Sequence, residues 1–307
     1  MSDIASVRHL AVVGVGLLGA SLGLALKRRG FAGRITGVAR SQATLDQARA
    51  VGAIDAGTLE IEHAVRDAQL VVVAVPLGAF DETFEALARH APQDAVITDV
   101  GSTKLSVQRA AARWLANPER FVGAHPMAGS ERQGPEAADA ELFAGKPCII
   151  CPPEVSDPKQ VAAGATALVE SLFQHLGMRL LTMTPEAHDR QVALTSHLPH
   201  AAAALLIETA MQHGGWDVAS TGFESTTRLA ASNPPMRRDI MLANRDALLA
   251  ALDAMAGNLA TLRQRLSDGD GQALVDWLET CKQRREQWLA DREKIQKGSR
   301  MNTDEHG

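Results

Sequence analysis

The stretch LAVVGVGLLGASLGLALKRRG at residues 10–30 decides the fold of this chain. It begins with an apolar run of strand length, continues through Gly-Val-Gly-Leu-Leu-Gly at 14–19 and ends in an Ala- and Leu-rich segment with helical periodicity. Because this Gly-x-Gly-x-x-Gly motif joins a strand to a helix, it predicts a dinucleotide-binding turn. The alternative is a glycine-rich turn in another α/β protein, such as a methyltransferase.

Each glycine of the motif has its own predicted role. Gly14 allows the tight turn, Gly16 lets the backbone approach a pyrophosphate, and Gly19 lets the helix pack closely on the strand. Leu17 precedes and Leu18 begins the helix predicted over 18–29, whose free N–H groups and positive dipole end favour phosphate. We therefore expect these five residues to bind the cofactor.

Composition narrows the class of protein. With 307 residues, 46% of them hydrophobic, the chain is long enough for two domains with a sizeable core. A net charge of −5 without a large basic block argues against nucleic acid as a partner. No apolar run reaches the about 18 residues that a membrane span needs, and the N-terminus does not resemble a signal peptide. The three cysteines fit a reducing, cytoplasmic location.

Apolar runs of strand length recur up to residue 183, with helical segments between them. This order predicts a Rossmann-type, doubly wound α/β domain over residues 1–183. From Thr184, where Thr-Pro-Glu marks a helix start, only helical patterns follow, so we predict an all-α domain over 184–297 and a disordered tail over 298–307. The wide apolar faces of these helices indicate a homodimer interface. The predicted strands are 8–13, 34–39, 70–75, 95–100, 121–124, 147–151 and 178–183, and the predicted helices of the second domain are 185–213, 217–231, 236–267 and 271–296.

The end of the second strand bears on the choice of cofactor. An acid there hydrogen-bonds the ribose 2′-hydroxyl of NAD, whereas a basic residue accommodates the 2′-phosphate of NADP. Arg40 and Ser41 occupy this position, so we predict NADP as the preferred cofactor, bound through a charge-assisted hydrogen bond. If Arg40 is only a solvated loop residue, NAD is still accepted. Val75 and Pro76, where the strand at 70–75 ends, complete the predicted cofactor site.

Polar side chains follow two further strands. Ser102 comes after the strand at 95–100 and His125 after the strand at 121–124, so both lie at the carboxyl edge, where open α/β sheets bind ligands. His125 is a candidate general base because the ordinary pKa of histidine lies near neutral pH. The alternative is a surface or structural histidine.

The first helix of the second domain carries a polar stripe. Asp189, Ser196 and His200 lie seven and four residues apart and share one helix face, which favours the lining of a cleft over a dry core. Pro199 should kink this helix. His197 and His200 could suggest a metal pair, but no third ligand has a supporting spacing, and we predict no metal site.

Arg228 lies within an apolar stretch, and a buried arginine needs an anionic partner. Asp189 and Glu224 are the candidates within the chain. A substrate carboxylate, held by two hydrogen bonds, is the functional alternative.

Five motifs in order resemble the prephenate/arogenate (cyclohexadienyl) dehydrogenase family of tyrosine biosynthesis, over about residues 8–290. They are Gly14-x-Gly16-x-x-Gly19, Asp99-Val-Gly-Ser102-x-Lys104, Gly123-Ala-His125-Pro126-Met-Ala-Gly129-Ser130-Glu131, His188-Asp189 with Ser196-His197-Leu-Pro-His200, and Thr227-Arg228 with Arg238-Asp239-Ile240. The third and fourth motifs are much more specific than the glycine turn.

The resemblance implies roles for the matching residues. His125 would accept the proton of the substrate's ring hydroxyl, and Ser102 would hydrogen-bond that hydroxyl and help to orient the histidine. Arg228 would hold a substrate carboxylate. The remaining matches would lie in or at the edge of the substrate pocket: His188, Asp189, His197, His200, Ser130 and Glu131.

The reaction that the resemblance implies is NAD(P)-dependent oxidative decarboxylation by a Rossmann-type domain joined to a helical dimerisation domain. The substrate is a cyclohexadienol with carboxyl and hydroxyl groups on opposite ring carbons. As the hydroxyl proton leaves, hydride passes from the ring to the nicotinamide, and loss of CO2 makes the ring aromatic. Prephenate gives 4-hydroxyphenylpyruvate, and arogenate gives tyrosine.

Two residues depart from the family pattern. Arg237 stands where many members have a tryptophan, near the substrate side chain, and its charge would either favour the pyruvyl carboxylate of prephenate or point to solvent. Arg40 replaces the usual acid. Two other interpretations stay open: a β-hydroxyacid-type dehydrogenase, for which Lys104 is the only comparable catalytic lysine, and a non-catalytic NADP-binding sensor.

Overall fold

The computed structural model describes residues 3–129, 132–153, 162–214 and 216–304. By its internal contacts the chain divides into two compact units, Met1–Arg245 and Asp246–Gly307. The sequence predicts a domain boundary between residues 183 and 184. The first helices of the predicted helical domain therefore share a compact unit with the sheet.

A single sheet of eight strands, in the order β3-β2-β1-β4-β5-β6-β7-β8, lies in the described part of the first unit. All neighbouring strands are parallel except β6 and β7, which are antiparallel. The order runs outward in both directions from the β1–β4 pair, as in doubly wound folds, so the predicted Rossmann-type sheet is confirmed. The strands are β1 (His9–Val13), β2 (Arg34–Val38), β3 (Ala56–Thr58), β4 (Leu70–Val73), β5 (Val96–Asp99), β6 (Phe121–Pro126), β7 (Pro147–Cys151) and β8 (Arg179–Thr182).

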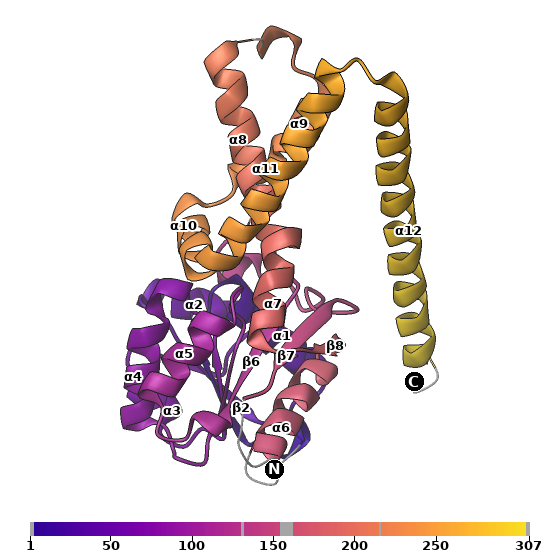
Figure 1. The fold of residues 1–307 in the computed structure, drawn as a ribbon. Helices are drawn as coiled ribbons and strands as arrows, with labels where there is room; N and C mark the ends of the chain where they lie inside the picture. Colours follow the sequence, from indigo (N-terminus) through magenta and orange to yellow (C-terminus); the bar gives the residue numbers. More distant parts are fainter. Residues whose placement is uncertain (1–2, 130–131, 154–161, 215, 305–307) are drawn as a thin grey trace. The chain divides into compact units, whose positions relative to one another are not determined.

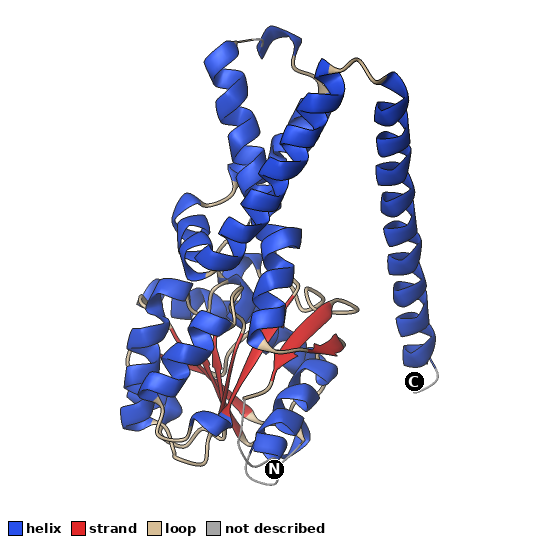
Figure 2. Ribbon diagram, viewed as in Figure 1, coloured by secondary structure: helices blue, strands red, loops and turns tan. Residues whose placement is uncertain are grey.

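Helices cover both faces of this sheet (Figures 1 and 2). Because side chains alternate along a strand, Leu10 and Val12 join one buried cluster, whereas Ala11 and Val13 join the other. The first cluster includes side chains of α1, α2 and α6, and the second includes side chains of α3, α4 and α5. These helices are α1 (Leu17–Arg28), α2 (Gln42–Ala50), α3 (Ile61–Val65), α4 (Phe80–His90), α5 (Leu105–Trp114) and α6 (Ala162–His175).

The helix that follows β8 contains a π turn. The sequence predicts one helix over 185–213 with a kink at Pro199, whereas the structure has α7 (Pro185–Val192), a π turn (Ala193–His197) and α8 (Leu198–His213). Pro199 has no N–H group, and its ring excludes the carbonyl of residue 195 from the usual position. The preceding turn widens, and the N–H of Leu198 donates to the carbonyl of Ala193.

Shorter elements complete the first unit: α9 (Thr221–Thr227), a 3₁₀ turn (Arg228–Ala231) and α10 (Pro234–Ala243). The sequence predicts an unbroken helix over 236–267, but Asn244 ends α10 and a new helix begins at Arg245.

The second unit holds α11 (Arg245–Ser267) and α12 (Gly271–Asp304). α12 continues to Asp304, so the described part of the tail that the sequence predicts to be disordered is helical. Over the described ranges of the chain, no helix combines the length and apolar character that a membrane crossing requires.

Candidate functional site

The glycine turn has the geometry of a phosphate cradle. Gly14 has a φ of +100°, and a Cβ on it would lie 2.5 Å from the carbonyl oxygen of Ala74. A Cβ on Gly19 would lie 2.1 Å from the carbonyl oxygen of Gly14, whereas a Cβ on Gly16 would meet nothing within 4 Å. The turn is therefore closely packed at its first and third glycines and open at its second.

The N-terminus of α1 faces this open position. Gly16 is the N-cap and Leu17 and Leu18 are the first helical residues, with no side chain capping their N–H groups. Free N–H groups at a helix N-terminus bind phosphate. The residues present therefore fit the pyrophosphate of a dinucleotide.

The other predicted cofactor residues lie at the carboxyl ends of β2 and β4. Arg40 is exposed and forms no hydrogen bond or ion pair within the described part of the chain. The hydroxyl of Ser41 accepts the N–H of Thr44 (3.3 Å) and so caps α2. Val75 and Pro76 follow β4, and Val75 lies against the turn at Gly14. Arg40 is thus available for an anionic group on the ribose.

A row of three hydrogen-bonded side chains lies at the carboxyl end of β6. His125, half-buried at the end of that strand, pairs through Nδ1 with Nε2 of His188 (2.7 Å). His188 in turn pairs through Nδ1 with Oδ1 of Asp189 (2.7 Å). The Nε2 of His125 makes no hydrogen bond with a described residue. The sequence predicts that His188 and Asp189 contact the substrate, but the structure buries both behind His125.

Asp189 also joins α7 to the start of α5. Its Oδ1 accepts the backbone N–H of Lys104 (2.8 Å), and its Oδ2 accepts that of Leu105 (3.0 Å). These N–H groups belong to the first turn of α5, where they have no partner within the helix. One carboxylate therefore caps α5 and supports the histidine row.

A buried ion pair lies beneath the row. Lys104 and Asp99 are 1% and 0% exposed and bonded to each other. The ammonium of Lys104 also donates to the carbonyl of Ala124 (2.7 Å), and Asp99 accepts the backbone N–H groups of Ala124 (2.9 Å) and Gly101 (2.8 Å). The pair thus fixes the backbone of the residue before His125.

The π turn brings His197 inward. The sequence predicts that Ser196 shares a face with Asp189 and His200, but His197 is the buried residue, and its Nδ1 lies 3.1 Å from Nδ2 of Asn244. Asn244 also donates to the carbonyl of Asp189 (2.8 Å). The sequence analysis missed Asn244 because its only signal, a break in a helical pattern, is weak.

Three basic side chains gather beyond the row. Burial lowers the pKa of His200; the charges of Arg237 and Arg228 lower it further, although the hydrogen bond from Nδ1 to the carbonyl of Ser196 (2.8 Å) opposes this. Burial also lowers the pKa of Arg237, whose Nε is buried without a hydrogen-bond partner. A buried guanidinium N–H without an acceptor is costly. This group of side chains suits an anion.

The histidines of the row are held neutral. Burial lowers the pKa of His125 well below its ordinary value, and the positive charges that His188, Lys104 and His197 carry or can acquire act in the same direction. Burial also lowers the pKa of His188, although Asp189 opposes it, and lowers the pKa of His197 to about 4. His125 is therefore able to accept a proton at neutral pH.

The remaining predicted residues divide into two sets. Ser102 lies half-buried in the loop after β5, and its hydroxyl makes no hydrogen bond with a described residue, so its role in binding the substrate hydroxyl and orienting His125 stays a prediction. Ser130 and Glu131 lie outside the described residues. In the part of the chain that the structure describes, no three His, Cys, Asp or Glu side chains are arranged to hold a metal ion.

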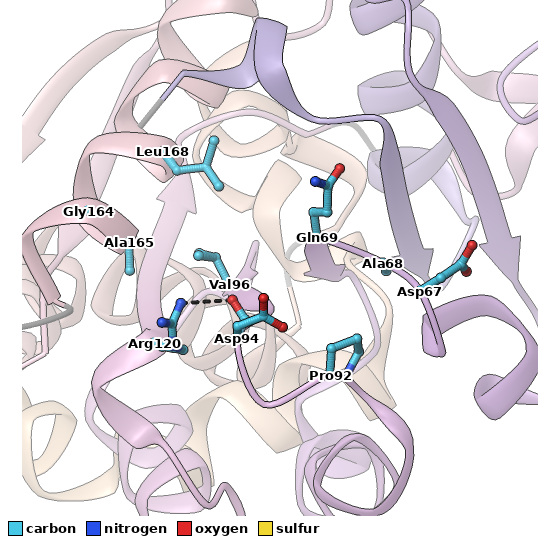
Figure 3. Close-up of a pocket in the computed structure, with 10 residues that line it drawn as sticks. All are labelled: Asp67, Ala68, Gln69, Pro92, Asp94, Val96, Arg120, Gly164, Ala165 and Leu168. Atoms are coloured by element: carbon cyan, nitrogen blue, oxygen red, sulfur yellow. Dashed lines mark hydrogen bonds between the residues drawn. The ribbon is translucent and has the colours of Figure 1, made fainter. Parts of the chain in front are cut away.

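A pocket of about 440 Å³ lies at the opposite edge of the sheet (Figure 3). Its residues precede β4, β5 and β6, begin β5 or belong to α6, among them Gln69, Asp94 and Arg120. Figure 3 shows Arg120 donating to the carbonyl of Asp94 (2.8 Å) across the pocket floor. Because the candidate site follows the carboxyl ends of the same parallel strands, this pocket is separate from it.

Comparison with known proteins places the chain among dehydrogenases. The family model "Prephenate dehydrogenase, nucleotide-binding domain" matches residues 22–181, and "Prephenate dehydrogenase, dimerization domain" matches residues 184–280. A cyclohexadienyl dehydrogenase of Zymomonas mobilis is 36% identical over 275 residues, which cover 88% of this chain and 92% of that protein.

Solved structures agree with these matches. Prephenate dehydrogenase of Aquifex aeolicus, in complex with hydroxyphenyl propionate and NAD+, is 31% identical with a TM-score of 0.85, over 92% of this chain and 98% of that one. Arogenate dehydrogenase of Synechocystis is 31% identical with a TM-score of 0.76, over 93% and 99%. Together with the sheet, the glycine turn and the site, these matches show that the chain belongs to the prephenate dehydrogenase family.

Proposed function

We propose that this chain catalyses the NAD(P)-dependent oxidative decarboxylation of prephenate, of arogenate or of both, with His125 as the general base. The observation that carries the proposal is the pairing of His125 with a buried His188–Asp189 row at the sheet edge that also holds the glycine turn. A neutral histidine with one unpaired ring nitrogen at that edge has the chemistry that proton removal from a ring hydroxyl needs.

The protein's share of the chemistry is orientation and proton removal. When bound, the nicotinamide accepts a hydride. His125 takes the hydroxyl proton of the substrate on Nε2, and Ser102, whose hydroxyl has no described partner, hydrogen-bonds the same oxygen. Loss of CO2 then makes the ring aromatic. The protein therefore lowers the activation barrier mainly by aligning substrate, base and cofactor.

The basic side chains beside His200 bind the carboxylates of the substrate. Prephenate carries a ring carboxylate and an anionic pyruvyl side chain, whereas the side chain of arogenate carries both a carboxylate and an ammonium group and is neutral overall. Arg228 holds the ring carboxylate, which both substrates share. Arg237 holds the pyruvyl carboxylate, and its buried, unpartnered Nε supports this role rather than an orientation into solvent. Prephenate is therefore the preferred substrate of the two.

The two arginines predict different substrate profiles. Arg228→Ala should raise KM for prephenate and arogenate alike, by about 10-fold or more, because each loses a charge-assisted contact worth about 1.5–3 kcal/mol. Arg237→Gln should raise KM for prephenate more than KM for arogenate, since the ammonium group of arogenate already offsets the charge of its side-chain carboxylate. Steady-state assays of both variants with both substrates test this. Equal effects of Arg237→Gln on the two substrates would contradict the assignment.

NADP is the preferred cofactor, because Arg40 at the end of β2 is exposed and has no described partner. In an assay that crosses NAD and NADP with prephenate and arogenate, kcat/KM should favour NADP by at least about tenfold, or about 1.4 kcal/mol. Arg40→Gln should remove most of that preference without changing the KM for the substrate. A preference for NAD in the parent enzyme would show that Arg40 does not bind the 2′-phosphate.

The same assay separates the proposed function from its alternatives. A β-hydroxyacid-type dehydrogenase would use Lys104, but that ammonium is buried in the ion pair with Asp99 and bonded to the carbonyl of Ala124. An NADP-binding sensor would bind NADP and turn over neither substrate. Such a result would refute the proposed enzyme function.

The chain acts as a homodimer through its helical region. Two observations support this: residues 184–280 match a model described as a dimerization domain, and helices of this region expose large apolar side chains. These are Leu205 and Met211 on α8, Leu249, Met255, Leu259 and Leu266 on α11, and Val275, Leu278 and Trp288 on α12. Light scattering should give twice the chain mass of 32.6 kDa. A monomer at micromolar concentration would exclude this proposal.

A further inference from the structure

We propose that His188 and Asp189 are positioning residues that determine which nitrogen of His125 carries the proton. In this view Asp189 fixes the tautomer of His188, His188 fixes that of His125, and the result is a lone pair on Nε2 of the base. The inference rests on the proposed function, because it deepens the role of His125 in that reaction. It goes beyond it by assigning the two buried residues behind the base.

The other partners of Asp189 determine the direction of its hydrogen bond with His188. Oδ1 of Asp189 accepts the backbone N–H of Lys104, and Oδ2 accepts that of Leu105. Backbone N–H groups can only donate, so both oxygens of this carboxylate act as acceptors. His188 is therefore the donor to Oδ1, and its proton lies on Nδ1.

The tautomer of His188 in turn determines which nitrogen of His125 carries the proton. A neutral imidazole has one N–H donor and one acceptor nitrogen. His188 is 0% exposed, and burial favours its neutral form. With the proton on Nδ1, its Nε2 is an acceptor, so the hydrogen bond at 2.7 Å is donated by Nδ1 of His125. The Nε2 of His125 is then unprotonated and, with no described partner, is free to act as the base.

The row also prepares the site for the charged state of the base. When His125 accepts a proton it becomes an imidazolium whose Nδ1–H already points to an acceptor. The negative charge of Asp189 stands behind that acceptor, so no group has to reorient during the proton transfer. The charged or titratable groups around the row include the Lys104–Asp99 pair beneath it, His197, which burial holds neutral, and Cys148, whose pKa is raised by burial. Asp189 is thus the anion that is connected to the base through the hydrogen bonds of His188.

Two substitutions of His188 separate positioning from packing. The side-chain amide of asparagine can take the place of Nδ1, so His188→Asn keeps a donor for Asp189 but does not reach His125. The longer glutamine can place its amide oxygen at the position of Nε2, so His188→Gln restores an acceptor for His125. We expect kcat to fall about 10- to 100-fold in His188→Asn, a part of the 10²–10⁴ that a general base supplies. His188→Gln should recover at least about threefold of that loss.

Substrate KM and NADP affinity should stay within about twofold of the parent in both variants, because neither contact is touched. His63→Asn, on the exposed surface of α3, is the matched control for loss of a histidine. If His188 is only a packing residue, both variants will lose thermal stability and keep the parent kcat at a temperature where they are folded. That result would overturn the proposal.

A measurement on the parent protein does not depend on the stability of the His188 variants. In protein labelled with ¹⁵N-histidine, long-range ¹H–¹⁵N correlation spectra at pH 7.5 distinguish the two neutral tautomers, and the His125 signals are identified by their loss in His125→Asn. We expect a protonated Nδ1 and an unprotonated Nε2. A protonated Nε2 would overturn the proposal. This spectrum needs no substrate, so it tests the tautomer of His125 independently of the reaction. A failure of the proposed enzyme function would instead be seen in the steady-state assay, as absent turnover by the parent.

Discussion

The variant His125→Asn is expected to lose about 10²- to 10⁴-fold in kcat, because it lacks the group that takes the substrate proton. NADP affinity should not change, since the glycine turn and Arg40 lie on other strands. Stopped-flow or steady-state assays of NADPH formation, together with fluorescence titration of the cofactor, measure the two quantities. A kcat within a few-fold of the parent would exclude His125 as the base.

The pH profile gives a second readout of the same residue. Burial lowers the pKa of His125 well below the ordinary value of histidine. A base with a lowered pKa stays unprotonated, and so competent, as the pH falls through the ordinary range, and it loses activity only below it. In the parent enzyme the acid limb of kcat/KM, which reports on the free enzyme, should therefore lie below pH 6.5. A limb at or above pH 6.5 would mean that the free enzyme does not hold this histidine neutral.

The largest expected effect on stability comes from the buried ion pair. In Lys104→Met, Asp99 keeps its two backbone N–H partners but loses its counter-ion, and an uncompensated buried charge costs about 3–5 kcal/mol. The Asp99→Asn/Lys104→Met double variant should recover at least about half of this, because it leaves no buried charge. Urea unfolding monitored by circular dichroism measures both changes.

The exposed pair Arg113–Asp81 provides the matched control. Its side chains are 65% and 57% exposed, and exposed pairs contribute about 0–1 kcal/mol. Arg113→Met should therefore change the free energy of unfolding by no more than that. If Lys104→Met costs as little as Arg113→Met, the buried pair does not hold the β6 backbone at Ala124, before His125.

The sheet and the glycine turn were predictable because their signals are local. An apolar run of strand length, such as 70–75, by itself predicts a buried strand. The spacing of Gly14, Gly16 and Gly19 predicts a tight turn, and the structure shows the close contacts of that turn. β3 escaped prediction because three residues, Ala-Gly-Thr, at the edge of a sheet carry no apolar pattern.

The arrangement behind the base could not be predicted from pattern alone. His188 and Asp189 are polar and close to other polar residues, which suggests a pocket lining, yet they are 0% and 4% exposed. They can be buried because His125 and the start of α5 satisfy their hydrogen bonds, and these partners lie 63 to 85 residues away in sequence. Asn244 illustrates the same limit, since its partners Asp189 and His197 are fixed only by the tertiary fold.

The π turn at Ala193–His197 determines how the two helices that it joins would respond to a change in chain length. Each residue of a regular helix turns the chain by about 100°, and the wide turn takes up one residue more than a regular turn does. Deleting one residue of this turn should therefore let α7 and α8 join as one regular helix with His200 on the same side as before, and only the residues of the turn itself, His197 among them, would change direction. In design, a single gap here would disturb the buried contact of His197 with Asn244 rather than the basic side chains beside His200.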